Sequence, residues 1–312
     1  MKSGTCAGSV WNSLDNYKKK SENGTGDKGM KKGEKAAIVC CSNQRPQSEK
    51  ETLKRLDQVL RSMGVIPVFG DRIYKDPEKR RPTGKERAGE LMKFYQDDSI
   101  REIFDISGGD IANEILPYLD YDAIAGSDKQ FWGYSDLTTV INAIQHRTGN
   151  EAVLYQVKHL VGAHGETQQN AFEQYLFQES EELTRFSYQF VQKSSMEGVT
   201  AGGNIRCLLK LAGTAYWPDL RGKILILEAL GGKREQLITY LSQLKQLGAF
   251  EQAAGILLGT FTTMEKEESA EAVCQLVRHF AGSEMPVAKT QEVGHGEDSK
   301  AVVMGRYMEL DG

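Results

Sequence analysis

The sequence has no long hydrophobic run and no strong excess of either charge. Its longest apolar stretches, such as residues 224–227, are far shorter than the ~20 residues that a helix needs to cross a bilayer. The 39 basic and 43 acidic residues leave a net charge of −4, so we expect neither a membrane nor nucleic acid as a partner. The length of 312 residues indicates one large or two ordinary globular domains.

Cysteine is scarce, and its five copies are an odd number. Cys40 and Cys41 are adjacent in a predicted buried strand and make a poor disulfide framework, which favours reduced thiols and a cytoplasmic location. Cys207 and Cys274 fall on apolar helix faces and are expected in the core. Cys6 follows no apolar segment, so neither a signal peptide nor a lipid anchor is indicated.

The usual cofactor and metal signatures are also missing. The glycine pairs at 108–109, 202–203 and 231–232 form neither a P-loop nor a dinucleotide fingerprint. His159 and His164 are five residues apart and do not share a helix face, and no second histidine or cysteine follows near His295. We therefore expect no cofactor and no metal ion.

The order of apolar and polar segments predicts two domains after a leader. Residues 1–33 are rich in Gly, Ser, Lys and Asn and predict a flexible leader, in which Met30 is an alternative native start. Residues 34–165 are expected to form an N-terminal α/β domain, residues 166–195 a helix and connector, and residues 196–312 a smaller C-terminal domain.

Alternating strand and helix patterns predict a mainly parallel sheet in the first domain. In the first domain we expect strands at 35–41, 65–69 and 100–106, with helices at 53–63 and 85–96. In the rest of the chain we expect, in order, a helix at 205–212, a strand at 223–228, a helix at 234–247, a strand at 255–259, a helix at 269–280 and a final strand at 301–304. Loops at the carboxyl ends of parallel strands are where such sheets bind ligands.

The segment 129–139 is the strongest candidate for chemistry. It reads as a short strand, a Gly-Tyr-Ser-Asp corner and a helix. A serine at such a corner exposes its hydroxyl beside the N–H groups of a helix N-terminus, where acyl transfer needs a nucleophile. The simpler interpretation is that Ser135 or Asp136 is only the N-cap of that helix.

Two further residues have similarly divided interpretations. Glu228 ends four consecutive aliphatic residues and so lies at the mouth of a buried strand, either as a functional carboxylate or as a capping or ion-pairing one. His295 is flanked by glycines and is either a functional base or an ordinary loop histidine. Neither pattern decides the question alone.

Several short blocks, taken together and in order, resemble one family. They are residues 100–109, 115–121, 131–138, 200–204, 211–214, 222–228, 255–261 and 294–296. From about Lys35 onward the chain is similar to the LD-carboxypeptidases (muramoyl-tetrapeptide carboxypeptidases) and the related microcin-immunity serine peptidases. The resemblance implies an α/β N-terminal domain with a mainly parallel sheet, a smaller strand-rich α+β C-terminal domain, and a homodimer.

The resemblance also implies site residues. Ser135 would be the nucleophile, His295 the general base and then acid, and Glu228 the carboxylate that orients the histidine. The backbone N–H groups of Asp136 and Gly109 would form the oxyanion hole. Since the serine lies in the first half of the chain and its partners in the second, the site would be assembled between the domains.

The implied activity is that of a cytoplasmic, metal-independent serine carboxypeptidase that releases a terminal D-amino acid from a small murein-type peptide. The alternatives are an amidase that cleaves a peptide- or aminoacyl-nucleotide, a binding protein that has lost turnover, and a metallo-amidase. The substrate surroundings differ from the family pattern, since Cys41-Ser42-Asn43 replaces Ala-Pro-Ser, Ser107 and Asp110 replace an arginine and an aromatic residue, and residues 155–158 and 229–232 also depart from it.

Overall fold

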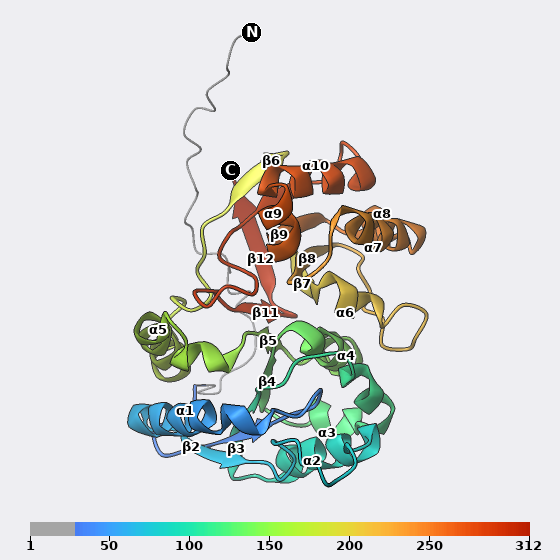
Figure 1. Cartoon of the computed structure of the whole chain (residues 1–312). Helices are drawn as coiled ribbons and strands as arrows, with labels where there is room; N and C mark the ends of the chain where they lie inside the picture. Colours follow the sequence, from blue (N-terminus) through green and yellow to red (C-terminus); the bar gives the residue numbers. More distant parts are fainter. Residues whose placement is uncertain (1–28) are drawn as a thin grey trace.

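The computed structural model describes residues 29–312, which form two six-stranded sheets with helices packed on them (Figure 1). The first sheet has the strand order β11-β5-β4-β3-β1-β2, and the second has the order β12-β7-β8-β9-β10-β6. The expected fold class, a mainly parallel α/β sheet followed by a strand-rich α+β half, is confirmed.

The first sheet is parallel except for β11, which runs antiparallel to β5. Its strands are β1 (Lys35–Val39), β2 (Ile66–Phe69), β3 (Ile100–Asp105), β4 (Gln130–Gly133), β5 (Ala152–Leu154) and β11 (Val302–Met304). The helices around it are α1 (Lys50–Met63), α2 (Gly84–Gln96), α3 (Tyr121–Ala125), α4 (Thr138–Thr148) and α5 (Gly165–Gln178), with the 3₁₀ turns η1 (Gln47–Glu49), η2 (Ala112–Tyr118), η3 (Ser135–Leu137) and η4 (Val157–Val161).

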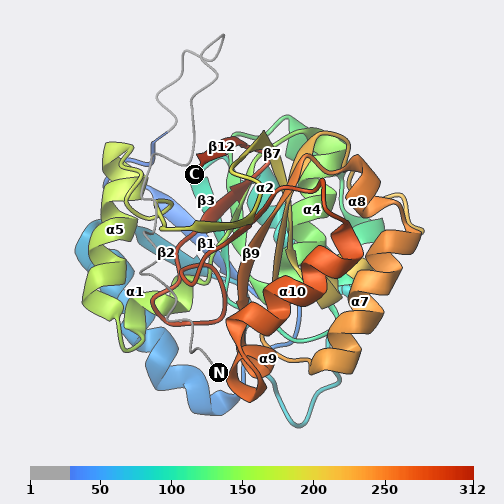
Figure 2. The ribbon, with the colours of Figure 1, turned by 90° about the horizontal axis from the view of Figure 1, so that it is seen from above.

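The second sheet has a parallel centre, β7 to β10, and an antiparallel strand at each edge. Its strands are β6 (Gln189–Gln192), β7 (Ser195–Asn204), β8 (Lys223–Ala229), β9 (Gly255–Phe261), β10 (Val287–Lys289) and β12 (Tyr307–Asp311). Its helices are α6 (Ile205–Leu209), α7 (Arg234–Gln246), α8 (Ala249–Gln252), α9 (Thr262–Glu267) and α10 (Ala270–Ala281), with α7 and α10 side by side in Figure 2.

One apolar core extends through both halves. The face of the first sheet that carries α2 and α4 belongs to the same cluster of buried residues as the whole second sheet. The opposite face is covered by α1 and α5. Phe172 of α5 packs on Phe104 and Trp132, and Leu56 of α1 belongs to the same buried cluster. The helix that follows Ser135 therefore lies between the two sheets.

Polar contacts between α4 and β7 fix the two sheets to each other. The side-chain amide of Asn142 donates to the Gly202 carbonyl (2.8 Å) and accepts from the Gly202 N–H (2.9 Å). Both groups are fully buried, so each hydrogen bond also satisfies a group that water cannot reach. The interface is therefore specified by geometry as well as by apolar contact.

The structure corrects several expected elements. The last expected strand, 301–304, joins the first sheet as β11 and is followed by β12, which the sequence pattern did not reveal. The helix expected at 205–212 ends at Leu209. The ten-residue strand β7, at 195–204, was not predicted. The glycines and polar residues of β7 hide its strand character.

The expected segment boundaries at 33, 165 and 195 stay predictions, but some segments pack across them. Residues 1–28, including Cys6, lie outside the described residues. Met30, at the end of the expected leader, is buried, and its N–H donates to the Leu176 carbonyl in α5 (3.0 Å). The four cysteines within the described range are buried and unpaired. No helix of residues 29–312 combines the length and the apolar character needed to cross a membrane.

Glu102 is a buried carboxyl whose titration should be measurable in the stability of the fold. It lies in β3 and accepts a hydrogen bond from the indole N–H of Trp132 (2.8 Å). Burial raises its pKa from 4.5 to about 8. A folded-state pKa above the unfolded value means that stability is highest below the unfolded pKa and falls as the pH rises toward 8.

We expect Glu102→Gln to remove most of this loss, because glutamine accepts the same indole hydrogen bond and carries no charge. The variant should match the wild type near pH 4.5 and be more stable by about 4 kcal/mol at pH 9, measured by urea unfolding. Glu251→Gln, at an exposed position, is the control and should show no pH-dependent gain. A Glu102→Gln protein with the pH profile of the wild type would contradict the prediction.

Candidate active site

Ser135 lies at a sharp corner between β4 and α4. Tyr134 is extended (φ −144°, ψ 163°), and Ser135 has a φ of +55°, in the left-handed region that costs a non-glycine residue about 1 kcal/mol or more. A Cβ at Gly133 would lie 2.6 Å from the Cβ of Leu137, so the chain needs glycine there to turn this sharply. The corner holds a half-buried serine at the end of a strand, as strand-to-helix nucleophile turns do.

The alternative interpretation of Ser135 and Asp136 as helix caps is wrong. The residues at the cap positions of η3 and α4 are Tyr134 and Leu137, and neither makes a side-chain capping hydrogen bond. The strained serine is therefore not explained by helix capping.

The carboxylate of Asp136 is used to hold neighbouring loops. It is fully buried, and one of its oxygens accepts from the Ser42 hydroxyl (2.6 Å) and the Ala112 N–H (2.8 Å). The other oxygen is 2.5 Å from Nζ of Lys210, which comes from the second half of the chain. These contacts fix the backbone of Asp136 while leaving its N–H free of them.

The glycine loop after β3 supplies the second predicted N–H group. Gly109 has a φ of +120°, and the side chain of Asn43 occupies the place where its Cβ would be, so only glycine fits. Asn43 also donates its N–H to the Gly108 carbonyl (3.1 Å). Within residues 29–312, neither the Gly109 nor the Asp136 N–H donates to another residue, so both are available to a ligand oxygen.

Glu228 is fully buried near the end of β8, where the pairing with β9 shifts register. Its Oε1 accepts from Nδ2 of Asn204 (2.9 Å), which is its direct partner on β7. The Asn204 N–H in turn donates to the Thr138 hydroxyl at the start of α4 (3.0 Å). The carboxylate is therefore tied to the helix that follows Ser135.

His295 lies in an irregular loop and contacts Glu228. Its Nδ1 is 2.7 Å from Oε2 of Glu228, and its ring lies edge-on to Tyr134 with 5.0 Å between ring centroids. The contact with Glu228 favours the tautomer with the proton on Nδ1 and leaves Nε2 as the free base. Tyr134 is the residue before Ser135, so the imidazole lies beside the serine corner.

Ser135 and His295 are brought to the same place but do not share a hydrogen bond. Nε2 of His295 is buried and has no hydrogen-bond partner among the residues that the structure describes. The hydroxyls of Tyr95, Tyr134 and Thr260 and Nε2 of His159 are buried and unpaired in the same way, so it is the position of the imidazole beside the serine corner that marks this atom as functional. Chemically, the arrangement offers a hydroxyl, an oriented imidazole base and two free N–H donors, which are the parts needed for acyl transfer.

Comparison with known proteins adds the family. Residues 36–156 match the N-terminal domain of LD-carboxypeptidases, and residues 197–310 match their C-terminal domain. The chain belongs to the LD-carboxypeptidase family. The expected family resemblance is confirmed.

Individual relatives of this family span nearly the whole chain. A probable murein peptide carboxypeptidase of Bacillus subtilis is 27% identical over 294 residues, covering 89% of each chain. The microcin C7 self-immunity protein MccF of Escherichia coli is 24% identical, covering 81% of this chain and 83% of MccF. Solved structures of MccF (TM-score 0.79, 22% identity, 91% and 97% covered) and of a muramoyltetrapeptide carboxypeptidase from Oxalobacter formigenes (0.72, 22%, 89% and 95%) share the fold.

Sequence reasoning named Ser135, Glu228 and His295 but missed residues that position them. Asn204 lies in a block shared with the LD-carboxypeptidases, and its place opposite Glu228 follows only from the register of β7 and β8. Gln168 of α5, which is buried, donates to the carbonyls of Glu297 (3.2 Å) and Ser299 (3.1 Å) in the histidine loop. A glutamine in a polar helix gives no sequence signal for such a role.

Glu297, one of the acidic residues beside His295, has a structural partner. The carboxylate of Glu297 accepts a hydrogen bond from the Ala163 N–H (2.5 Å). The nearby His159 is a separate case, because burial lowers the pKa of its imidazole to about 4. Within the described range, no three His, Cys, Asp or Glu side chains gather as metal ligands would.

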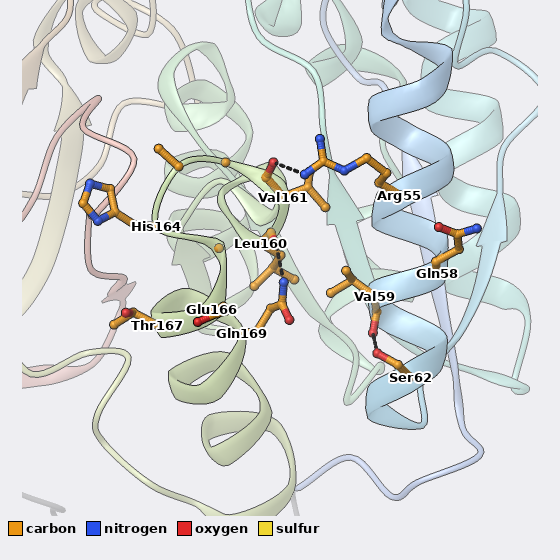
Figure 3. Close-up of a pocket in the computed structure, with 13 residues that line it drawn as sticks. Arg55, Gln58, Val59, Ser62, Leu160, Val161, His164, Glu166, Thr167 and Gln169 are labelled. Carbon is orange, nitrogen blue, oxygen red and sulfur yellow. Dashed lines mark hydrogen bonds between the residues drawn. The ribbon is translucent and has the colours of Figure 1, made fainter.

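A groove of about 700 Å³ lies elsewhere on this LD-carboxypeptidase-family protein. It runs between α1 and the start of α5, with Arg55, Val59 and Gln169 in its lining (Figure 3). None of the five predicted site residues lines it.

Lys210 should contribute strongly to stability because Asp136 has no exposure to water. We expect Lys210→Met to lower the free energy of unfolding by about 3 kcal/mol, since it leaves a buried carboxylate without its cation. Lys193→Met removes an exposed ion pair with Glu284 and should cost less than about 1 kcal/mol. Urea unfolding measures both, and equal losses would refute a special role for Lys210.

Proposed function

We propose that the protein is a serine carboxypeptidase that hydrolyses the amide between an L-configured centre and a terminal D-amino acid of a murein-type peptide. The observation that carries the proposal is the hydrogen-bonded series from Thr138 through Asn204 and Glu228 to His295. It orients an imidazole beside a serine whose backbone is strained. Membership of the LD-carboxypeptidase family supports the same reaction.

In the proposed reaction, Oγ of Ser135 attacks the carbonyl carbon while its proton passes to Nε2 of His295. The Gly109 and Asp136 N–H groups stabilise the oxyanion, each contributing about 3 kcal/mol. The imidazolium, stabilised by Glu228, gives its proton to the leaving amine, and the D-amino acid departs. Water activated by His295 then cleaves the acyl ester and restores the serine.

The Ser135 hydroxyl and Nε2 of His295 must first form a hydrogen bond, because Nε2 has no partner among the described residues. Catalytic hydrogen bonds are often long without substrate and tighten in the complex. We infer that a motion of the Ser135 side chain brings its hydroxyl to Nε2 of His295 when substrate binds.

A second candidate substrate is a peptide- or aminoacyl-nucleotide. Solved structures of MccF hold aspartyl sulfamoyl adenosine and glutamyl sulfamoyl guanosine, and MccF shares this fold. We place this amidase activity second because the murein peptide carboxypeptidase of Bacillus subtilis is more similar over a longer stretch. We further propose that the protein acts in the cytoplasm, in peptidoglycan recycling, as a homodimer.

Replacing Ser135 by alanine tests the proposed nucleophile. We expect the release of D-alanine from an L,D-tetrapeptide to fall by about 10⁴-fold or more, because no acyl ester can form. Ser62→Ala, at an exposed helix position, is the control and should keep the wild-type rate. Residual activity within tenfold of the wild type would exclude Ser135 as nucleophile.

The same assay separates the alternatives. Wild-type protein that cleaves an aminoacyl sulfamoyl nucleoside but not the tetrapeptide has the MccF-type activity. Protein that cleaves neither and does not react with a serine-directed phosphonate is a binding protein. Loss of activity in a chelator would favour a metallo-amidase.

Replacing Glu228 by glutamine tests the orienting carboxylate. Glutamine has nearly the same shape and can still accept from Asn204, but its amide would face Nδ1 of His295 and favour the wrong tautomer. We expect kcat to fall by about 10⁴-fold while the melting curve changes little. A kcat within tenfold of the wild type would show that the carboxylate is not needed.

A further inference from the structure

Helix α6 of the second half reaches the glycine loop of the first half. Arg206 forms an ion pair with Asp110 through its Nη1, and its Nη2 donates to the Gly109 carbonyl (3.1 Å). The guanidinium therefore lies next to the residue whose N–H is a proposed oxyanion donor.

The pair of Arg206 and Asp110 is open to solvent, with 43% and 65% of the two side chains exposed. Nζ of Lys210 also donates to the backbone carbonyl of Asp110 (2.9 Å). Lys210 is held more tightly than Arg206, because its side chain is only 18% exposed and is paired with the buried carboxylate of Asp136. Of these two cations, Arg206 is the one that can exchange its partner. Exposed ion pairs contribute little to stability, so the exchange has a small cost.

The position of Arg206 on the glycine loop suggests one particular ligand group. In a C-terminal amino acid, the carboxylate lies about 3.5 Å, the length of one extended residue, from the amide that is cleaved. The carbonyl of that amide would lie about 3 Å from the Gly109 N–H. The Arg206 Nη2 lies 3.1 Å from the carbonyl oxygen of the same glycine. We therefore expect the carboxylate of the leaving amino acid to come near this guanidinium.

We propose that Arg206 binds the terminal carboxylate of the substrate and that Asp110 is the resident counter-ion which the carboxylate displaces. This inference rests on the proposed carboxypeptidase function. A planar guanidinium matches a carboxylate through two parallel hydrogen bonds, and the bond to the Gly109 carbonyl keeps it in place when Asp110 leaves. The residue would make the enzyme select peptides with a free carboxyl end.

The test compares an L,D-tetrapeptide with a free carboxyl end and the same peptide with a C-terminal amide. For Arg206→Gln we expect KM for the free acid to rise by about tenfold or more, with kcat within about threefold, so that the preference for acid over amide falls. Arg206→Lys should restore part of that preference. Asp110→Asn should lower KM for the free acid, because Arg206 then has no competing carboxylate at this position.

Arg221→Gln is the matched control, since Arg221 also pairs with a nearby aspartate but lies before β8, at the opposite end from Glu228. It should leave the preference for the acid unchanged. If Arg206→Gln slows both substrates equally, Arg206 only holds the glycine loop and the inference is overturned. Thermal melting follows folding, and Arg206→Lys serves as the test if the glutamine variant does not fold.

Binding to Ser135→Ala protein, measured by calorimetry, separates this inference from the proposed function. Tighter binding of the acid than of the amide, lost in the Arg206→Gln background, supports the anchor even if the wild type turns over neither peptide. Turnover without any preference for the acid overturns the anchor and leaves the function. Protein that neither binds nor cleaves either peptide overturns both.

Discussion

The hydrogen bonds of Asn204 are the constraint on which the rest of the site depends. Its backbone N–H donates to the Thr138 hydroxyl of the first half, and its side chain donates to Glu228 of the second. Its side-chain oxygen also accepts from the Cys207 N–H and so begins α6. One nearly buried residue therefore sets the serine helix, the carboxylate and the helix of Arg206 relative to one another.

The two halves of the chain are better described as one packed body than as two lobes around an open hinge. A single apolar core runs from α2 and α4 into the second sheet, and β11 returns from the end of the chain to pair with β5. Core packing of this kind has discrete arrangements and does not deform gradually. Since a misplacement of about 1 Å can cost on the order of 100-fold in rate, this rigidity suits a site built from both halves.

Sequence reasoning found the parts of the site that have a local pattern. The turn around Ser135, the aliphatic run before Glu228 and the glycines around His295 are each visible in a few residues. The contacts that join them are not, because Asn204 meets Glu228 only through strand register and meets Thr138 only through the packing of two sheets. For the same reason, residues 301–304 could be recognised as a strand but not assigned to the first sheet.

Two of the energetic costs in this structure lie at the site. Ser135 keeps a left-handed backbone that costs about 1 kcal/mol or more, and the unpaired Nε2 of His295 costs about 1–3 kcal/mol. Such costs persist only where contacts with the surrounding structure stabilise the strained conformation by more than the strain costs. Here the surrounding structure is the Asn204 network and the shared core, and a substrate that supplies partners to the hydroxyl and the imidazole would relieve part of the cost. The unpaired imidazole nitrogen therefore favours binding at the same point where the chemistry is proposed.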